Sequence, residues 1–278
     1  MTTTILSGAE LARQIRASVS TDAAALGSMS DIHPRLAVVV ATDDESSAWY
    51  VRSIAKTAAR SGLLCDIVEP GAAGILGELE SLSADPTVHG IILQTPLPAG
   101  ARFEELAAAI SPEKDVDGAN PLSLGRLTAG LPAHPPATAA AVMALLDHYE
   151  IPLAGRRVVV VGRSNVVGKP VAHLLLARDA TVTICHSRTA DLAQCTRSAD
   201  VLVAAVGRPG LITAEHVNPH AVVIDVGTNP TADGGLVGDV DQEAVSGRAA
   251  ALTPVPGGVG PVTTALLLRH TINAATPP

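Results

Sequence analysis

The hydrophobic pattern of the chain changes near its middle. In the second half, runs of β-branched residues recur between stretches that are long enough for helices. Near-continuous apolar runs of this kind are typical of parallel strands that are buried on both faces. The second half is therefore predicted to be an α/β domain with a Rossmann-like, doubly wound parallel sheet. Its expected strands are residues 157–161 (RVVVV), 181–185 (TVTIC), 201–205 (VLVAA) and 222–226 (VVIDV).

The first half mixes helical and strand patterns. Ser7 and Glu10 have the spacing of a capping box and open an amphipathic stretch that reaches to about residue 25. Pro96 and Pro98 follow an apolar run, so the loop that carries them must leave the sheet. Three prolines between residues 132 and 136 mark the expected domain boundary. Strands are predicted at 35–41 and 90–93, and helices at 47–61, 103–110 and 138–149.

Length and composition exclude several classes of protein. The 278 residues suit two modest domains. A net charge of -8 argues against a nucleic-acid surface, which needs a basic stripe. No apolar run approaches the roughly 18 residues of a membrane helix, and the first seven residues lack the pattern of a secretory signal. The protein is therefore expected to be cytoplasmic, with no nucleic-acid or membrane partner.

Cysteine and lysine are both scarce. The three cysteines show neither CxxC nor Cys/His ligand spacing, so we expect isolated thiols and no metal site. The lysines are Lys56, Lys114 and Lys169, against 16 arginines. Any chemistry that needs an amine therefore has few candidates.

A loop that contains two glycines follows the first predicted parallel strand. It reads Gly162-Arg163-Ser164-Asn165-Val166-Val167-Gly168 and leads into a helical apolar run. Gly162 permits a tight turn, and Gly168 lets the helix start approach the strand, so that free N–H groups can face a pyrophosphate. The spacing departs from GxGxxG, and a plain connection between strand and helix is the alternative.

The end of the next strand reads Cys185-His186-Ser187-Arg188-Thr189. In dinucleotide-binding folds this position meets the adenosine ribose, where an Asp or Glu binds a free 2′-hydroxyl. Here Ser187 and Arg188, together with Arg163, offer hydrogen-bond donors and positive charge, which suit a 2′-phosphate. The sequence therefore favours NADP over NAD, with a solvated basic turn as the alternative.

A loop with three prolines and three glycines spans residues 253–261 (TPVPGGVGP). This composition is incompatible with a helix or strand interior. The loop is expected to border the cofactor, to act as a hinge to the first domain, or to do both.

Taken together, these segments resemble the methylenetetrahydrofolate dehydrogenase/cyclohydrolase family over nearly the whole chain. Eight motifs stand in the family's order, which makes the resemblance highly specific. They are Ser47-x-x-Tyr50-Val51, Gln94-x-Pro96-Leu97-Pro98, residues 112–118 (PEKDVDG), Gly162-Arg163-Ser164-x-x-Val167-Gly168-x-Pro170, Cys185-His186-Ser187-x-Thr189, residues 223–227 (VIDVG), residues 238–240 (GDV) and residues 253–261.

The resemblance implies a homodimer with folate bound in a cleft between two domains of each subunit. The folate-binding, catalytic domain would be residues 1–133 plus 262–278, because the C-terminal helix returns to it, and the NADP-binding domain would be residues 134–261. The implied substrate-binding residues are Ser47, Tyr50, Pro96, Asp117, Gly258 and Pro261. The implied cofactor-binding residues are Gly162, Arg163, Ser164, Val167, Gly168, His186, Ser187, Arg188, Gly207, Gly227 and Thr228.

The resemblance implies that three residues belong to the catalytic centre. Tyr50 would stack on the folate ring system, Gln94 would reach the catalytic centre, and Asp117 would bind the pterin edge. An aromatic face suits a flat heterocycle, and a carboxylate suits adjacent N–H donors. The alternatives are a core aromatic at Tyr50, a surface polar residue at Gln94 and a turn-forming residue at Asp117.

The main departure from the family is Ile54, which stands where the family has a catalytic lysine. That lysine lies one helical turn beyond the tyrosine, on the same face. Lys56 lies six residues from Tyr50, roughly 120° around the helix, so it cannot replace the lysine without a shift in register. The sequence also departs from the family at Ala119, Asn120, Ser123 and 137–139 (ATA).

The missing lysine affects the two family activities differently. Oxidation of the N–CH2–N bridge is a hydride transfer in which no proton is removed, so positioning is most of the requirement. Hydrolysis of the methenyl product needs an activated water and proton transfer. We therefore expect an NADP-dependent methylenetetrahydrofolate dehydrogenase with weak or absent cyclohydrolase activity. The alternatives are a diverged paralogue for another iminium or C–N compound, a catalytically silent binding partner, and a fully bifunctional enzyme.

Overall fold

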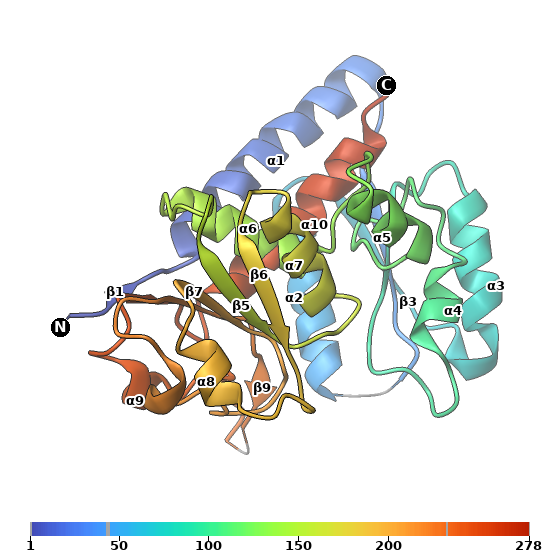
Figure 1. The fold of residues 1–278 in the computed structure, drawn as a ribbon. Coiled ribbons are helices and arrows are strands. Elements are labelled where there is room, and N and C mark those ends of the chain that lie inside the picture. Colours follow the sequence, from blue (N-terminus) through green and yellow to red (C-terminus); the bar gives the residue numbers. More distant parts are fainter. Residues whose placement is uncertain (1, 43–44, 232, 278) are drawn as a thin grey trace. The chain divides into compact units, whose positions relative to one another are not determined.

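The chain forms two compact units in the computed structural model, which describes residues 2–42, 45–231 and 233–277 and leaves aside the side chains of residues 45–47. One unit contains residues 1–12 and 138–263, and the other contains residues 13–137 and 264–278. We call them the sheet unit and the helical unit. The expected domains, residues 1–133 plus 262–278 and residues 134–261, stay a prediction. In the structure, strand β1 (Thr4–Ile5; Figure 1) groups with the second half of the chain, because it pairs with a strand there.

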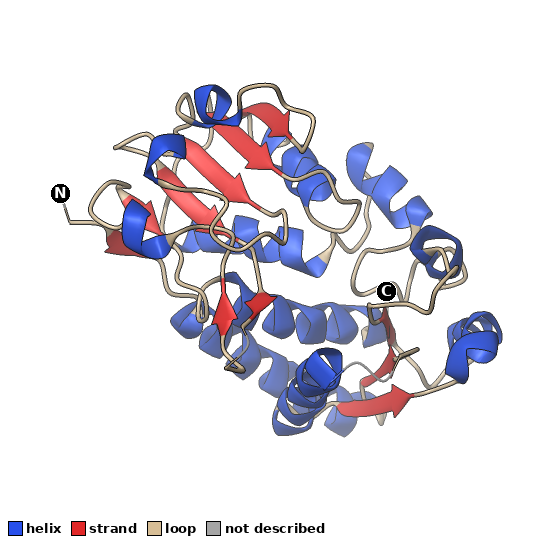
Figure 2. Ribbon diagram, turned by 90° about the horizontal axis from the view of Figure 1, so that it is seen from below, coloured by secondary structure: helices blue, strands red, loops and turns tan. Residues whose placement is uncertain are grey.

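The sheet unit is built on a six-stranded parallel sheet with the order β1-β11-β8-β7-β5-β6. The strands are visible together in Figure 2. Two of the predicted strands are confirmed in full, and the other two end one residue early. The two-residue strands β1 and β11 were not predicted. The bounds are β5 (Arg157–Val161), β6 (Thr181–Cys185), β7 (Val201–Ala204), β8 (Val222–Asp225) and β11 (Ala251–Leu252).

Register brings the carboxyl ends of three strands to the same edge. Val161 of β5 pairs with Cys185 of β6 on one side and with Ala204 of β7 on the other. The chain passes from β5 to one side of that strand and then returns to its other side, which makes the β5/β7 edge a topological switch point. Ligands bind at such points in open α/β sheets.

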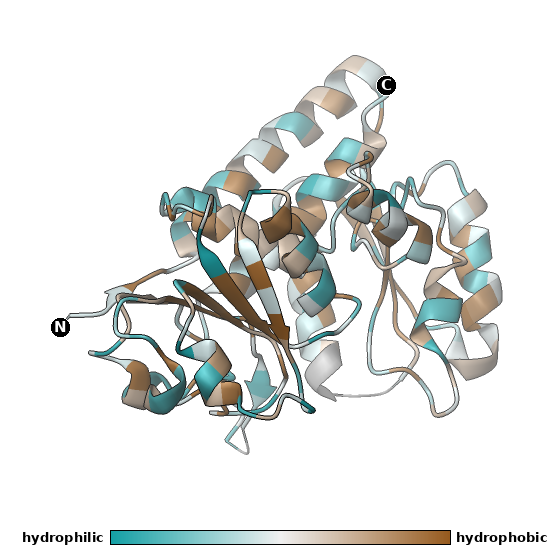
Figure 3. Cartoon of the chain, viewed as in Figure 1, coloured by the Kyte–Doolittle hydropathy of each residue, from teal (hydrophilic) through white to brown (hydrophobic). Residues whose placement is uncertain are grey.

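The central strands are apolar because both faces of the sheet are covered. All four residues of β7 are buried, and β5 is buried from Val158 onward. Figure 3 shows these strands in brown, at the hydrophobic end of the scale. The covering and peripheral elements are α6 (Ala137–His148), α7 (Gly168–Leu176), α8 (Leu192–Thr196), η1 (Ala214–His216), the ribbon β9 (Asn229–Pro230) with β10 (Leu236–Val237), and α9 (Gln242–Val245).

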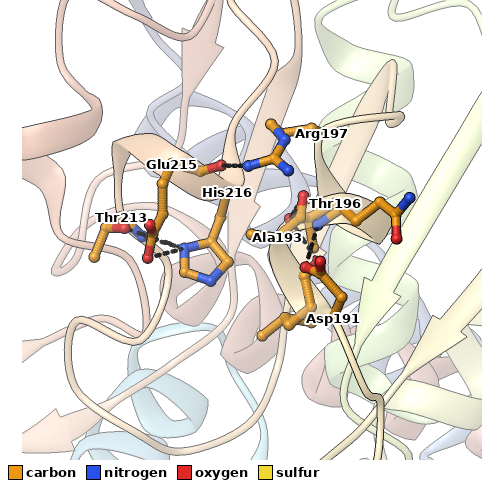
Figure 4. Close-up of polar contacts among 9 residues, drawn as sticks. Asp191, Ala193, Thr196, Arg197, Thr213, Glu215 and His216 are labelled. Carbon is orange, nitrogen blue, oxygen red and sulfur yellow. Dashed lines mark hydrogen bonds and ion pairs between the residues drawn. The ribbon is translucent and has the colours of Figure 1, made fainter.

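Polar contacts hold α8 against η1, as Figure 4 shows. The Asp191 side chain caps α8 by accepting a hydrogen bond from the backbone N–H of Gln194 at 2.8 Å. One turn later, the Arg197 side chain donates to the carbonyl oxygen of Glu215 at 3.3 Å. In η1, His216 Nδ1 lies 3.1 Å from Thr213 Oγ1. The Arg197–Glu215 hydrogen bond thus joins α8 to η1, and the other two contacts stabilise each segment internally.

The helical unit contains a three-stranded parallel sheet with the order β3-β2-β4. As predicted, the chain leaves this sheet after Leu93. β2 ends two residues earlier than predicted, and neither β3 nor α3 was predicted. The bounds are β2 (Arg35–Val39), β3 (Leu64–Val68), β4 (Gly90–Leu93), α1 (Ala9–Ser30), α2 (Glu45–Arg60), α3 (Gly71–Ala84), α4 (Phe103–Ala107) and α5 (Pro121–Thr128).

The last helix corrects one expectation about the loop at 253–261. The C-terminal helix was expected to follow this loop from about residue 262, whereas helix α10 (Val259–Ala275) begins three residues earlier, so Gly260 and Pro261 belong to its first turn. Proline is tolerated there because the first N–H groups of a helix have no intrahelical partner. The remaining loop is tied down by the backbone N–H of Gly8, which donates to the carbonyl oxygen of Gly257 at 2.8 Å.

Among the described residues, no helix combines the length and the apolar character needed to cross a membrane.

Candidate functional site: a pocket at the sheet edge and a buried carboxyl group

A pocket of about 410 Å³ opens at the carboxyl ends of β5, β6 and β7. Its lining comes from the three loops that follow these strands, together with Leu192 and Leu211. It is therefore at the switch-point edge, where the fold predicts a ligand. Of the residues expected to bind a cofactor, the structure places five in the lining: Gly162, Arg163, Ser164, His186 and Ser187.

Close packing explains the two glycines of the first loop. Gly162 has φ +128°, and an added Cβ would overlap the carbonyl oxygen of Ala205 on the neighbouring loop. An added Cβ on Gly168 would overlap the backbone of Gly162 and Arg163. A side chain at either position would therefore displace the loop that lines the pocket.

The start of α7 does not present free N–H groups in the way the sequence suggested. Ser164 Oγ accepts from the backbone N–H groups of Val167 at 3.1 Å and Gly168 at 3.3 Å. The N–H of Lys169 donates to the carbonyl oxygen of Ser164 at 3.1 Å. The hydroxyl of Ser164 thus caps the helix, and neither Val167 nor Gly168 belongs to the pocket lining.

Two arginines line the pocket, but the second one is Arg208 rather than the expected Arg188. Arg163 and Arg208 contribute to the lining, whereas Arg188 does not. Arg188 is exposed, and its backbone N–H donates to His186 Nδ1 at 3.1 Å. Sequence reasoning missed Arg208, although its position directly after Gly207 in the turn beyond a parallel strand was the available signal. The lining residues include no Asp or Glu.

The other expected cofactor residues, Gly207, Gly227 and Thr228, lie outside the lining. Gly207 and Gly227 are nevertheless fixed by buried carboxylates. The N–H of Gly207 donates to Asp239 Oδ2 at 3.0 Å, and the N–H of Gly227 donates to Asp225 Oδ1 at 3.0 Å. Thr228 is exposed.

In the helical unit, the structure brings Tyr50 and Asp117 together. Burial raises the pKa of the Asp117 carboxyl to about 7; the charge of Asp115 adds to the shift, and the backbone N–H of Ala137 opposes it. Burial also raises the pKa of Tyr50 to about 12, with a further contribution from the charge of Asp117. At neutral pH, Asp117 can therefore both take up and release a proton, whereas Tyr50 stays protonated.

The backbone beside Asp117 is held by α10. His270 is buried, and burial lowers its pKa to about 4, so its imidazole is neutral at neutral pH. Its Nδ1 lies 2.8 Å from the carbonyl oxygen of Val116, to which the neutral ring donates. His134 stacks on this ring with the centroids 4.9 Å apart. The residue that precedes Asp117 is thus anchored independently of any ligand.

Ile54 lies on α2 with its side chain completely buried (0 % exposed). It belongs to a hydrophobic cluster with Val116 and Ala137, and Tyr50 packs against the same cluster. The position therefore contributes to the core and supplies no titratable group.

None of the three lysines, all of which the structure describes, replaces the missing amine. Lys56 is exposed. Lys114 donates to the carbonyl oxygens of Leu82 at 3.2 Å and Asp85 at 2.5 Å. Lys169 belongs to the sheet unit, where its ammonium donates to Asn165 at 2.7 Å.

The remaining expected substrate residues belong to both units. Gln94 follows β4, with its side-chain amide donating to the carbonyl oxygen of Thr95 at 2.8 Å, and Pro96 is exposed. Gly258 and Pro261 belong to the sheet unit rather than to the helical unit that carries Tyr50 and Asp117. The Ser47 side chain lies outside the described part of the structure.

Comparison with known proteins identifies the family. Residues 6–117 match the tetrahydrofolate dehydrogenase/cyclohydrolase catalytic domain, and residues 136–277 match the NAD(P)-binding domain of the same family. A protein from Saccharopolyspora erythraea called bifunctional protein FolD 1 is 74% identical and aligns over 99% of this chain and 94% of its own length. A protein of the same name from Rhodococcus jostii is 65% identical over 97% of this chain and 92% of its own.

Solved structures agree with these matches. The FolD methylenetetrahydrofolate dehydrogenase/cyclohydrolase from Campylobacter jejuni has a TM-score of 0.94 at 38% identity and covers 98% of both chains. The enzyme from Trypanosoma brucei, solved with NADP and an inhibitor, has a TM-score of 0.93 at 37% identity, with 99% of this chain and 98% of that one covered. The expected α/β fold with a Rossmann-like domain is thereby confirmed, as is a nicotinamide-dinucleotide cofactor. The chain belongs to the tetrahydrofolate dehydrogenase/cyclohydrolase family.

Proposed function

We propose that the protein oxidises 5,10-methylenetetrahydrofolate with NADP and also hydrolyses the 5,10-methenyl product. The observation that carries this proposal is the coexistence of a cation-lined pocket at the sheet edge with a carboxyl group whose pKa is about 7 beside Tyr50. The first feature suits a phosphorylated dinucleotide, and the second suits proton transfer at neutral pH. The close relatives, which are called bifunctional, support the pair of activities over the dehydrogenase alone.

The choice of NADP over NAD rests on the pocket lining. Arg163 and Ser187 lie in loops that follow β5 and β6, where the adenosine ribose is bound in this class of fold. A guanidinium and a hydroxyl favour a 2′-phosphate, whereas an acidic residue would favour a free 2′-hydroxyl. The relative from Trypanosoma brucei, with its bound NADP, supports this choice.

The hydride step requires orientation more than acid–base chemistry. NADP, held in the pocket lined by Arg163 and Ser187, would supply the acceptor for a hydride from the one-carbon bridge, and the resulting cation would be stabilised by its own two nitrogens. Tyr50 would hold the folate ring system by stacking, and the Asp117 carboxylate would accept hydrogen bonds from the pterin edge. Replacement of lysine by Ile54 leaves these contacts intact.

The hydrolytic step needs a group that accepts a proton from water. We assign this role to Asp117, because Ile54 does not titrate and Tyr50 stays protonated at neutral pH. Its pKa near 7 lies close to the operating pH, which is the range in which a general base is most effective. Our first expectation, that loss of the lysine leaves hydrolysis weak or absent, is therefore replaced by the bifunctional alternative.

Arg163→Ala tests the assignment of NADP. We expect KM for NADP to rise by about 10- to 100-fold, since a charge-assisted hydrogen bond contributes about 1.5–3 kcal/mol. The KM for NAD should change by less than about twofold, because NAD lacks the 2′-phosphate. Arg188→Ala is the matched control, because this neighbouring arginine lies outside the pocket lining, and it should leave both values close to wild type. Equal losses with NADP and NAD would contradict the assignment.

Turnover by the purified wild-type chain tests the function as a whole. With methylenetetrahydrofolate, we expect NADP to be reduced faster than NAD. With methenyltetrahydrofolate supplied alone, we expect hydrolysis well above the rate in buffer. Binding of both ligands without turnover would instead indicate a silent binding partner, and reduction of NADP with other iminium precursors alone would indicate a diverged paralogue.

We also propose a cytoplasmic homodimer, as the family resemblance implies. Sedimentation or light scattering should give about twice the mass of the single chain. A monomer that turns over at the full rate would contradict this proposal.

A further inference from the structure

Asp239 carries a buried carboxylate that contacts the loop after β7. Its side chain is fully buried (0 % exposed). Asp239 Oδ2 accepts from the backbone N–H groups of Val206 at 2.6 Å and Gly207 at 3.0 Å, and Oδ1 accepts from the N–H of Arg208 at 2.8 Å. Three consecutive backbone donors thus converge on one carboxylate.

A fourth donor comes from strand β9. Asn229 Nδ2 donates to Asp239 Oδ1 at 3.0 Å. All four donors are neutral, so the buried charge is balanced by oriented N–H dipoles rather than by a cation. A neutral side chain in this position could not satisfy all four donors, since an amide would bring its own N–H groups against some of them.

The backbone around Asp239 is itself fixed by Asp225 at the end of β8. Asp225 Oδ1 accepts from the N–H of Asp239 at 2.9 Å, and Oδ2 accepts from the N–H of Val240 at 3.0 Å. An added Cβ on Gly227 would overlap the Asp239 carboxylate, and one on Gly238 would overlap that of Asp225. The two carboxylates therefore stand in a close-packed arrangement that defines where Asp239 points.

Two of the backbone groups that Asp239 holds belong to pocket-lining residues. Val206 and Arg208 both line the pocket. The loop is in a turn, with Gly207 at φ +64°, and the side chain of Arg208 is exposed. The position of the Arg208 guanidinium therefore depends on the backbone that Asp239 holds.

We propose that Asp239 is a positioning residue that fixes the Val206–Arg208 loop, and with it the Arg208 side chain, for binding of the dinucleotide phosphates. Asp239 does not touch the ligand and acts through the loop. The inference rests on the proposed NADP binding and adds to it two residues that were not among the expected cofactor-binding residues. Pre-organised donors lower the ordering cost that a ligand would otherwise meet on binding.

The experiment measures NADPH binding directly by the change in nicotinamide fluorescence, alongside KM values and thermal unfolding. We expect Asp239→Asn to weaken NADPH binding by at least tenfold and to leave the KM for methylenetetrahydrofolate within twofold. Asp241→Asn is the matched control. Asp241 caps α9 by accepting from the N–H of Ala244 at 3.0 Å, and asparagine caps helices equally well, so this variant should match wild type.

A double variant distinguishes a loss of loop positioning from a general loss of protein stability. In Asp239→Asn combined with Asn229→Asp, the new amide at 239 can donate to the new carboxylate at 229. We expect NADPH binding to recover at least threefold relative to the single variant. Unchanged NADPH binding by folded Asp239→Asn would overturn the proposal, as would a loss of binding that tracks the fall in unfolding temperature across the variants.

Arg208→Ala keeps the proposal testable even if Asp239→Asn does not fold, because it alters an exposed side chain. We expect a loss of NADPH binding of at least fivefold with an unchanged unfolding temperature, and wild-type binding would overturn the proposal. Failure of the proposed function has a different signature, since wild-type protein would then bind NADPH no more tightly than NADH, or would bind it without turning over methylenetetrahydrofolate.

Discussion

Asp117→Asn should slow the hydrolysis of methenyltetrahydrofolate by about 10²- to 10⁴-fold, the usual contribution of general acid–base catalysis. The kcat for NADP reduction should stay within about tenfold of wild type, because no proton moves in the hydride step. The KM for methylenetetrahydrofolate should rise, since an amide loses part of the pterin contact. Single-turnover hydrolysis and steady-state oxidation, measured on the same preparation, give the two values.

The pH dependence of the hydrolysis rate shows in which ionisation state Asp117 acts. A general base acts in its ionised form, so the enzyme-specific rate of hydrolysis should rise with pH through about 7, the pKa of Asp117. Asp117→Asn should lack this step after the buffer rate is subtracted. Glu113→Gln, which changes an exposed carboxylate on the same segment, is the control and should behave as wild type. Hydrolysis by Asp117→Asn at the wild-type rate would contradict the assigned role.

Stability provides a second readout on the same variant. The pKa of Asp117 in the folded protein is raised above its ordinary value of 3.8, because the fold favours the protonated carboxyl group. The resulting contribution to the free energy of unfolding is fully present below about pH 4 and is lost as the pH rises through about 7. Asparagine removes the buried charge. The unfolding temperature should therefore rise by about 2–4 °C at pH 8, which corresponds to about 1 kcal/mol, and should be unchanged at pH 4.

The second large effect is expected at Ile54, because its side chain is fully enclosed by the core of the helical unit. Ile54→Ala should lower the free energy of unfolding by about 2–5 kcal/mol, and Ile54→Val by about 0.5–1.5 kcal/mol. Ile54→Lys should cost at least as much as alanine, since an ammonium would be buried without a partner. Denaturant unfolding monitored through Trp49, which lies on the same helix, measures all three.

Activity of the lysine variant separates two explanations of the substitution. We expect hydrolysis by Ile54→Lys to stay at or below the wild-type rate, because the position lies in the core and Asp117 supplies the proton transfer. A stable Ile54→Lys variant with much faster hydrolysis would show instead that the isoleucine disables a site that is still arranged for an amine.

The strands that could be predicted from sequence are those with an uninterrupted local run of apolar or β-branched residues. The runs RVVVV and TVTIC match β5 and β6 in full, although β6 lies at the edge of its sheet. Strand β3 was missed because Asp66 stands in its centre and interrupts the apolar run. Strands β1 and β11 have two residues each and exist through their pairing, which no local pattern encodes.

The residues of the candidate site could likewise be predicted only in part. Gly162 and Arg163 were predicted because they directly follow a recognisable strand, and the pocket lining contains both residues. The capping role of Ser164 was missed, since a serine before a helix gives no sign of which N–H groups it will bind. Asp239 stands in the motif at residues 238–240, but its contact with the loop after β7 was not predicted, because the N–H groups that it binds lie 31 to 33 residues earlier in the chain. Contacts of that kind follow from the order of strands rather than from spacing in the sequence.

The most direct test of the account supplies methenyltetrahydrofolate to purified wild-type protein at pH 7.5 and follows its disappearance without NADP. We expect decay well above the buffer rate with wild-type protein, and decay at the buffer rate with Asp117→Asn. Decay at the buffer rate with wild-type protein that still reduces NADP would contradict it and would make the chain a dehydrogenase alone.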